Sequence, residues 1–126
     1  MKLIRLLCML MLLVFSTQAL AQKPLIVCEK STHNFGDIHE SKGKARHTFV
    51  VKNVGKAPLV INNCAASCGC TTPTWTKSPI APGKTGKVDV VYDTKDRPGQ
   101  FSKTVSVYSN ATKKPLILTI RGNVIE

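Results

Sequence analysis

The chain has few of the residues and patterns that catalytic sites require. Among 126 residues it has 7 acidic side chains and 3 histidines. It contains no glycine-rich phosphate loop after a strand, no nucleophile elbow and no evident Ser, His and acid set. The two close acidic pairs, Asp37 with Glu40 and Asp93 with Asp96, fall at expected turns and offer too few oxygens for calcium. We therefore expect a protein that is not an enzyme.

Long hydrophobic runs are also lacking, except at the N-terminus. There Lys2 and Arg5 precede an apolar run over residues 6–15, and a small-residue site, Ala19-Leu20-Ala21, precedes Gln22. This pattern predicts a secretory signal peptide over residues 1–21. The run is too short for a transmembrane span, and no stop-transfer segment follows it. We expect an exported protein, periplasmic or at the cell surface, whose mature domain covers residues 22–126.

Acidic charge is scarce relative to basic charge. The chain has 18 Lys and Arg against 7 Asp and Glu, and removal of Lys2 and Arg5 with the signal peptide leaves a net charge of +9. The basic residues are spread over turns, where lysine keeps strand edges soluble. An anionic surface is the alternative partner that such a charge allows. Nucleic acid is disfavoured by export and because no aromatic stacking platform accompanies the lysines.

The mature part shows no helical period and reads as short β-strands separated by turn signals. Val88, Val90 and Tyr92 alternate onto one face, as do Leu116, Leu118 and Ile120. The pattern predicts an all-β fold, an immunoglobulin-like antiparallel β-sandwich of about seven strands, with a small closed barrel as the alternative. The expected strands cover residues 25–28, 34–38, 47–53, 58–62, 87–92, 101–109 and 116–121.

Four cysteines remain after the signal peptide takes Cys8: Cys28, Cys64, Cys68 and Cys70. The last three lie in one predicted loop, and Gly69 lets the backbone turn so that Cys68 and Cys70 can bond. In an oxidising compartment, four cysteines favour two disulfides, of which three pairings exist. Soft-metal binding, with Cu(I) held by Cys64, Cys68 and Cys70, is the sharper hypothesis. Thiol and disulfide exchange at Cys68 and Cys70 is a third, although nothing nearby in the sequence lowers a thiol pKa.

The remaining candidate residues have ordinary structural interpretations. His33, His39 and His47 lie near strand ends and could approach one another, but polar strand-end residues explain them. Trp75 is expected to cover the core beside the cysteines, with a partner surface as the alternative.

Several short motifs are distributed along the expected mature chain. They are Phe35-Gly36, residues 49–55, Ser67-Cys68-Gly69-Cys70-Thr71, Trp75, Pro79-Ile80, Pro82-Gly83, residues 90–93, Pro98-Gly99, residues 107–110 and Ile120-Arg121-Gly122. Together they resemble the exported bacterial domain-of-unknown-function family 1573, and the resemblance covers nearly all of the mature chain. It implies an immunoglobulin-like sandwich, related in architecture to domains of cilium-associated proteins and pilus chaperones, and no established activity.

Two functions follow as hypotheses. The first is a non-catalytic envelope module that binds another protein or a surface component, with its cysteines as structural cross-links. The alternative is a periplasmic soft-metal or thiol-redox protein that acts through Cys64, Cys68 and Cys70.

Overall fold

Alternation of buried and exposed side chains organises the described part of the chain into eight strands. The computed structural model describes residues 22–126, so the predicted signal peptide lies outside the described residues. A short 3₁₀ turn, η2 (Glu40–Lys42), follows the second strand. The strands are β1 (Ile26–Val27), β2 (Thr32–His39), β3 (Ala45–Asn53), β4 (Ile61–Ala66), β5 (Thr71–Trp75), β6 (Thr85–Tyr92), β7 (Gly99–Ser109) and β8 (Leu116–Ile125).

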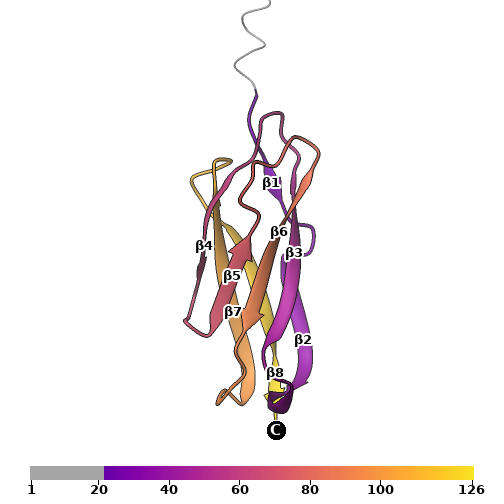
Figure 1. Ribbon diagram of the computed structural model, residues 1–126, viewed down its shortest axis with the longest axis vertical. Coiled ribbons are helices and arrows are strands. Elements are labelled where there is room, and N and C mark those ends of the chain that lie inside the picture. Colours follow the sequence, from indigo (N-terminus) through magenta and orange to yellow (C-terminus); the bar gives the residue numbers. More distant parts are fainter. Residues whose placement is uncertain (1–21) are drawn as a thin grey trace, which may run out of the picture.

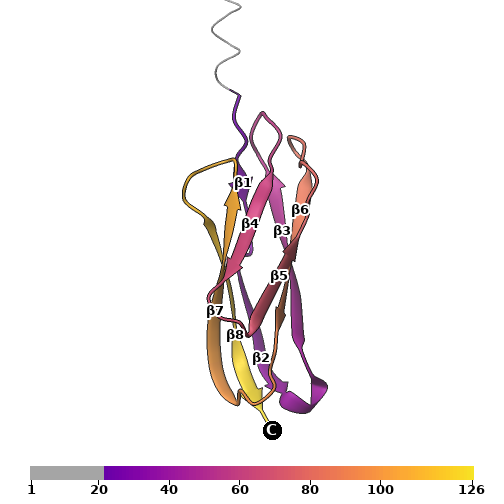
Figure 2. The same ribbon diagram turned by 60° about the vertical axis from the view of Figure 1, so that its left-hand side comes forward.

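The strands form two four-stranded sheets packed face to face (Figure 1). One sheet has the order β1-β3-β6-β5 and the other β2-β8-β7-β4. This confirms the predicted sandwich and its immunoglobulin-like strand arrangement. Figure 2 shows β4 and β5 side by side at one edge of the sandwich, where the chain passes between the sheets. Within residues 22–126, no helix is long and apolar enough to cross a membrane.

One strand pair departs from the antiparallel expectation. β2 pairs with β8 in parallel, whereas the other five pairs are antiparallel. The chain leaves the first sheet after β1 and enters the second as β2 without reversing its direction. β2 and β8 therefore run toward the same end of the sandwich, where the C-terminus lies, and they pair in parallel (Figure 1).

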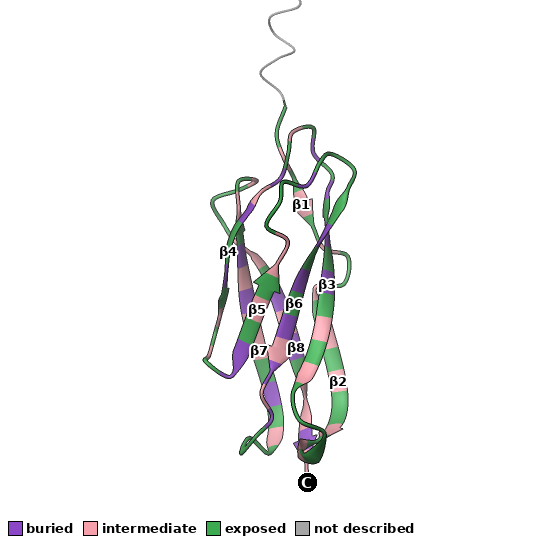
Figure 3. Ribbon diagram, in the orientation of Figure 1, coloured by how far each residue is buried: buried purple, intermediate pink, exposed green. Residues whose placement is uncertain are grey.

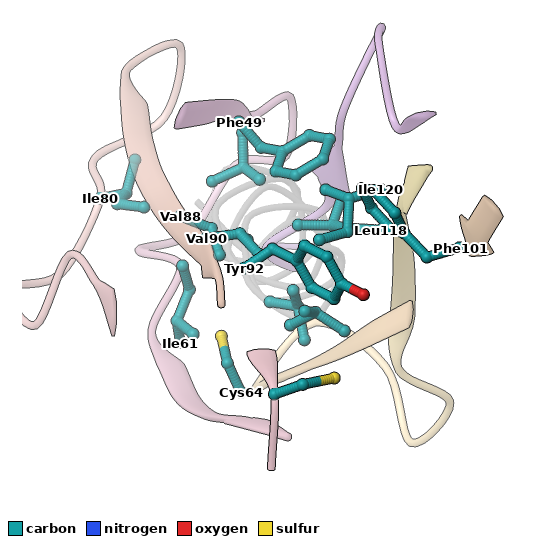
Figure 4. Close-up of a cluster of buried hydrophobic side chains, with 14 of the residues drawn as sticks. Phe49, Ile61, Cys64, Ile80, Val88, Val90, Tyr92, Phe101, Leu118 and Ile120 are labelled. Atoms are coloured by element: carbon teal, nitrogen blue, oxygen red, sulfur yellow. The ribbon is translucent and has the colours of Figure 1, made fainter. Parts of the chain in front are cut away.

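The predicted strand faces agree well with the buried core. Val88, Val90 and Tyr92 are all buried, and so are Leu118 and Ile120. Figure 3 shows the buried residues alternating with exposed ones along the strands. The Tyr92 and Phe101 rings stack with centroids 4.0 Å apart, and Figure 4 shows them among the aliphatic side chains of both sheets. Burial of these side chains holds the two sheets together.

β5 was not among the expected strands, and β4 begins later than predicted. The β5 sequence, Thr-Thr-Pro-Thr-Trp, lacks apolar alternation and contains Pro73, which disfavours a central strand. The structure places β5 at the edge of its sheet, where a proline is tolerated. Residues 58–60, expected at the start of a strand, instead contribute an isolated bridge between Leu59 and Ile80.

Two histidines from opposite sheets stack on each other. The rings of His33 on β2 and His47 on β3 have centroids 3.7 Å apart and are tilted by 8°. His39 lies at the far end of β2 and is exposed. Burial lowers the pKa of His47, and the neighbouring His33 lowers it further.

This pair predicts a loss of stability in mild acid. The folded state binds fewer protons at His47 than the unfolded state does. The contribution of neutral His47 to the free energy of unfolding is therefore fully present above the unfolded pKa of about 6.5. It is lost as the pH falls through the lower, folded pKa. We expect the melting temperature to decline between pH 7.5 and 5, and the decline to be smaller in His47→Gln. His39→Gln is the control, and an equal effect of the two substitutions would contradict the prediction.

Candidate functional site

The cysteine motif forms a tight turn between β4 and β5, which belong to different sheets. The Thr71 N–H donates to the Cys68 carbonyl at 3.3 Å, which closes the turn. On one side, the Ser67 N–H donates to the Thr104 carbonyl of β7 at 2.9 Å. On the other, the Asp93 N–H donates to the Cys70 carbonyl at 2.9 Å. Main-chain hydrogen bonds therefore hold this turn to both sheets without help from the sulfur atoms.

Cys68 and Cys70 form a disulfide within this turn, with Cα atoms 5.3 Å apart. Cys70 is 6% exposed, whereas Cys68 is half-buried. The buried Thr71 hydroxyl lies 3.6 Å from the Cys70 Sγ and 3.8 Å from the Cys68 Sγ. Gly69 does not have a positive φ, and a Cβ added there would meet nothing within 4 Å. Glycine is therefore not sterically required at this position, contrary to the sequence-based expectation.

The other two cysteines are free, so the expected pair of disulfides is wrong in number: residues 22–126 contain one. Cys64 does not lie in the loop but on β4, where its side chain is 7% exposed and faces the core (Figure 4). Burial raises the pKa of the Cys64 thiol to about 11, and the Lys77 ammonium opposes this shift. Burial also raises the pKa of the half-buried Cys28. Both residues are poor nucleophiles at neutral pH.

The Cu(I) hypothesis gains no support from this geometry. Among residues 22–126, no three His, Cys, Asp or Glu side chains gather closely enough to hold a metal ion. Two of the proposed ligands, Cys68 and Cys70, bond to each other instead, and a thiolate site needs their free sulfurs.

Trp75 lies at the end of β5, half-buried against the core, as expected for a core cover. The Lys77 Nζ lies 3.2 Å from the centre of its ring, in a cation–π contact. This contact covers ring surface that the alternative role, a partner-binding surface, would need.

The Cys68–Cys70 bond should contribute less stability than a disulfide that closes a longer loop. The chain-entropy model gives about 1.6 kcal/mol for a loop of about three residues, against about 3 kcal/mol for a loop of 15. We expect reduction to lower the melting temperature by roughly 6 to 13 °C for a domain of this size. Thermal unfolding with and without a reductant measures the difference. Unfolding of the reduced protein at 37 °C would contradict this prediction and would show that the Cys68–Cys70 bond is a structural cross-link.

A second candidate site, not predicted from the sequence, is the open edge of β3. The Val54 N–H donates to the Leu25 carbonyl at 3.0 Å, whereas the Asn53 N–H donates to the Lys84 carbonyl on the β6 side. Main-chain groups alternate in direction along a strand, so those of Thr48 and Val50 point to the same side as those of Val54. β1 ends at Val27, opposite Lys52. Thr48 and Val50 therefore have no strand partner at this edge among residues 22–126.

A groove of about 410 Å³ lies along this edge. Four of the six large hydrophobic side chains that are exposed within residues 22–126 lie in this region: Leu25, Val27, Val50 and Val54. Val50 is 53% exposed and Val54 47%. The groove is lined on one side by Val27, Cys28 and Lys30 and on the other by Thr48, Val50 and Val54.

The other edge strands carry features that discourage pairing with a further strand. Pro73 interrupts β5, and the register of β4 shifts between Ile61 and Asn63. The register of β2 shifts between Asn34 and Asp37, around Gly36 with φ 66°. Prolines and bulges at edges prevent unwanted pairing. β3 pairs with β6 in continuous register from Ala45 to Lys52 and contains no proline. Among the sheet edges formed by residues 22–126, the open part of β3 is therefore the best suited to an added strand.

The fold and the edge strands define an immunoglobulin-like β-sandwich with a crossover between β1 and β2. Residues 26–124 match the family described as "Protein of unknown function (DUF1573)", and the chain belongs to this family. This confirms the resemblance found in the sequence. No curated protein matches the chain.

Solved structures show the same fold at low sequence identity. A protein of unknown function from Porphyromonas gingivalis W83 is similar with a TM-score of 0.71 and 14% identity, over 82% of this chain and 48% of that one. The Vibrio cholerae VesB protease is similar with a TM-score of 0.59 and 16% identity, over 82% and 32%. The Bacteroides ovatus GH5 xyloglucanase, in complex with a XXXG heptasaccharide, is similar with a TM-score of 0.51 and 12% identity, over 81% and 19%. The chain thus spans half or less of each of these proteins, and the likeness shows the fold alone.

Proposed function

We propose that the chain is an exported, non-catalytic module that binds an extended segment of another protein by adding it to the open edge of β3. The observation that carries this proposal is the pair of unpaired main-chain positions, Thr48 and Val50, beside an apolar groove. Strand addition uses both features: main-chain hydrogen bonds supply affinity, and pockets for alternate side chains supply specificity.

The groove indicates the chemistry of the segment. An added strand directs every second side chain to the face where Val50 and Val54 are exposed, so apolar residues should alternate in the partner. Lys30 and Lys52 line the same groove, against the single acidic residue Glu29. With a mature net charge of +9, this favours acidic residues flanking the apolar ones.

The comparisons are consistent with a module that accompanies other domains. The similarity to the VesB protease and to the xyloglucanase covers about a third and a fifth of those chains.

The test is selection of peptides from a displayed library of random ten-residue sequences, using the purified mature domain. We expect enriched peptides to contain alternating apolar residues with acidic flanks. Thr48→Pro removes the free N–H without breaking a bond to β6, and Val50→Lys charges the groove. Both should reduce binding at least about tenfold, because a strand-addition site loses a main-chain donor or an apolar contact.

Two matched controls make the result specific. Thr48→Val removes the hydrogen bond from the Thr48 hydroxyl to Asp89 but keeps the N–H, and Ile117→Lys charges a similarly exposed residue on the other sheet. Both should bind as the unchanged domain does. Amide exchange gives an independent reading: the Thr48 and Val50 N–H groups should exchange quickly in the free domain and slowly with peptide. The proposal would be overturned if no peptide were enriched, or if the Thr48 and Val50 amides were already protected in the free domain. It would also be overturned if the domain bound a heparin-like polysaccharide and Thr48→Pro did not change that binding.

A further inference from the structure

The Cys68–Cys70 disulfide has the features of an exchangeable bond rather than of a structural cross-link. The turn that contains it is already held to both sheets by the main-chain hydrogen bonds of Ser67 and Cys70. The bond joins residues only two apart, so it restricts little of the unfolded chain. The bond therefore places a disulfide in a turn whose shape is already held by main-chain hydrogen bonds.

The two sulfur atoms differ in access. Cys70 is buried, and Cys68 is half-buried and followed by Gly69, which is exposed and has open space where a side chain would be. We therefore expect an incoming thiolate to reach the Cys68 Sγ more readily than the Cys70 Sγ. The rate of thiol and disulfide exchange depends on which sulfur is attacked and on its accessibility.

The turn also contains groups that stabilise the products of exchange. The Cys70 N–H points to the Cys68 Sγ at 3.2 Å, and a hydrogen bond to a charged sulfur favours its thiolate form. The Thr71 hydroxyl, 3.6 Å from the Cys70 Sγ, is placed to donate to that sulfur when it leaves. Cys64 and Cys28 are both free, so neither offers a disulfide that a partner thiol could exchange with.

We propose that this turn is a thiol–disulfide exchange site in which Cys68 is the attacked sulfur and Cys70 the buried leaving sulfur, and that its substrate is an exposed dithiol of another protein. A partner thiolate forms a bond to the Cys68 Sγ, and the Cys68–Cys70 bond breaks with its electron pair on Cys70. The second partner thiolate then attacks the partner sulfur of the mixed disulfide and releases Cys68. The two protons of the dithiol end on Cys68 and Cys70, so the partner is oxidised and the turn is reduced.

The first test uses dithiothreitol as the dithiol probe on the oxidised mature domain under native conditions. Alkylation and peptide mass mapping follow the free thiols at each cysteine. We expect reduction of Cys68 and Cys70 at a rate proportional to dithiothreitol concentration, while the amides of the β-sheets stay protected. A reduction rate that is independent of dithiothreitol concentration and equal to the rate of global unfolding would overturn the proposal. So would isolation of the domain with free thiols at Cys68 and Cys70 and with bound copper.

The second test separates the roles of the two sulfurs. In Cys70→Ser, glutathione disulfide should form an adduct at Cys68. In Cys68→Ser, the adduct at Cys70 should form at least about tenfold more slowly, because buried thiols are inert. Equal rates, or a faster reaction at Cys70, would overturn the assignment. Neither outcome bears on peptide binding at β3, which lies in a different part of the fold, so the two proposals can fail separately.

Discussion

Replacing Asn53 by leucine should lower the free energy of unfolding by about 3 kcal/mol or more, because up to three main-chain groups lose their hydrogen-bond partner at about 1 to 3 kcal/mol each. The fourth group, the Ile80 carbonyl, keeps the Leu59 N–H as a donor. For a domain of this size, the expected loss corresponds to a fall in melting temperature of roughly 12 °C or more. Thermal or urea unfolding of the purified mature domain measures the loss.

The effect is large because one side chain serves four main-chain groups. Asn53 is 0% exposed, at the end of β3. Its Oδ1 accepts from the Gly55 N–H at 2.9 Å and from the Leu25 N–H at 3.3 Å. Its Nδ2 donates to the carbonyls of Ala57 and Ile80, at 2.8 and 2.9 Å. The side chain thereby ties together the segment before β1 and the two loops that follow β3 and β5.

Asn110 provides a matched comparison. Its side chain also bridges two main-chain groups, accepting from the Val60 N–H and donating to the Pro58 carbonyl, but in an exposed place. Water replaces these bonds when they are lost, so Asn110→Leu should cost about 1 kcal/mol or less. A cost for Asn53→Leu no greater than that for Asn110→Leu would contradict the prediction.

The second large effect is expected for Gly55→Ala, which should detach β1 from β3. Gly55 is buried, and an added Cβ would overlap the main chain of Lys23, Pro24 and Leu25. A main-chain obstacle cannot rotate away as a side chain can, so the segment itself must move. The hydrogen bonds from Val54 to Leu25 and from Lys56 to Lys23 would be lost with it. We expect a cost of about 2 to 4 kcal/mol, at the upper end of overpacking effects.

Limited trypsin digestion gives a local reading of this change. Cleavage after Lys30 should become faster, and the amides of Val54 and Lys56 should lose their protection. Gly69→Ala is the control, because its added Cβ would meet nothing within 4 Å, and it should change stability by less than about 0.5 kcal/mol. Unchanged protection of Val54 in Gly55→Ala would show that the segment accommodates the methyl group.

The strand faces were predictable because they depend on a local pattern. Val88, Val90 and Tyr92 occupy every second position of β6, and this spacing puts them on one face whichever strands lie beside them. β5 was not predicted because only its position at a sheet edge makes Pro73 and its polar residues acceptable in a strand. The parallel pairing of β2 with β8 was not predicted either, because it depends on a crossover that no residue pattern marks.

The candidate sites also include one that the sequence predicted in part and one that it did not predict. The motif around Cys68 and Cys70 was visible as a cluster of thiols, but the count of four cysteines suggested two disulfides. Pairing depends on which side chains meet in space: Cys64 faces the core from β4, and Cys28 lies at the crossover after β1. Asn53 and the edge at Thr48 and Val50 gave no signal, since their importance comes from contacts with residues up to 28 positions away or from a missing neighbour.

By itself, therefore, the amino-acid sequence determined an all-β sandwich and membership of the DUF1573 family, because alternation, turn residues and motifs are local features of the chain. The tertiary structure alone decided which cysteines bond, which of them is accessible and which strand edge is left open. These properties depend on the order of strands in the two sheets, and that order is set by packing between residues far apart in the sequence.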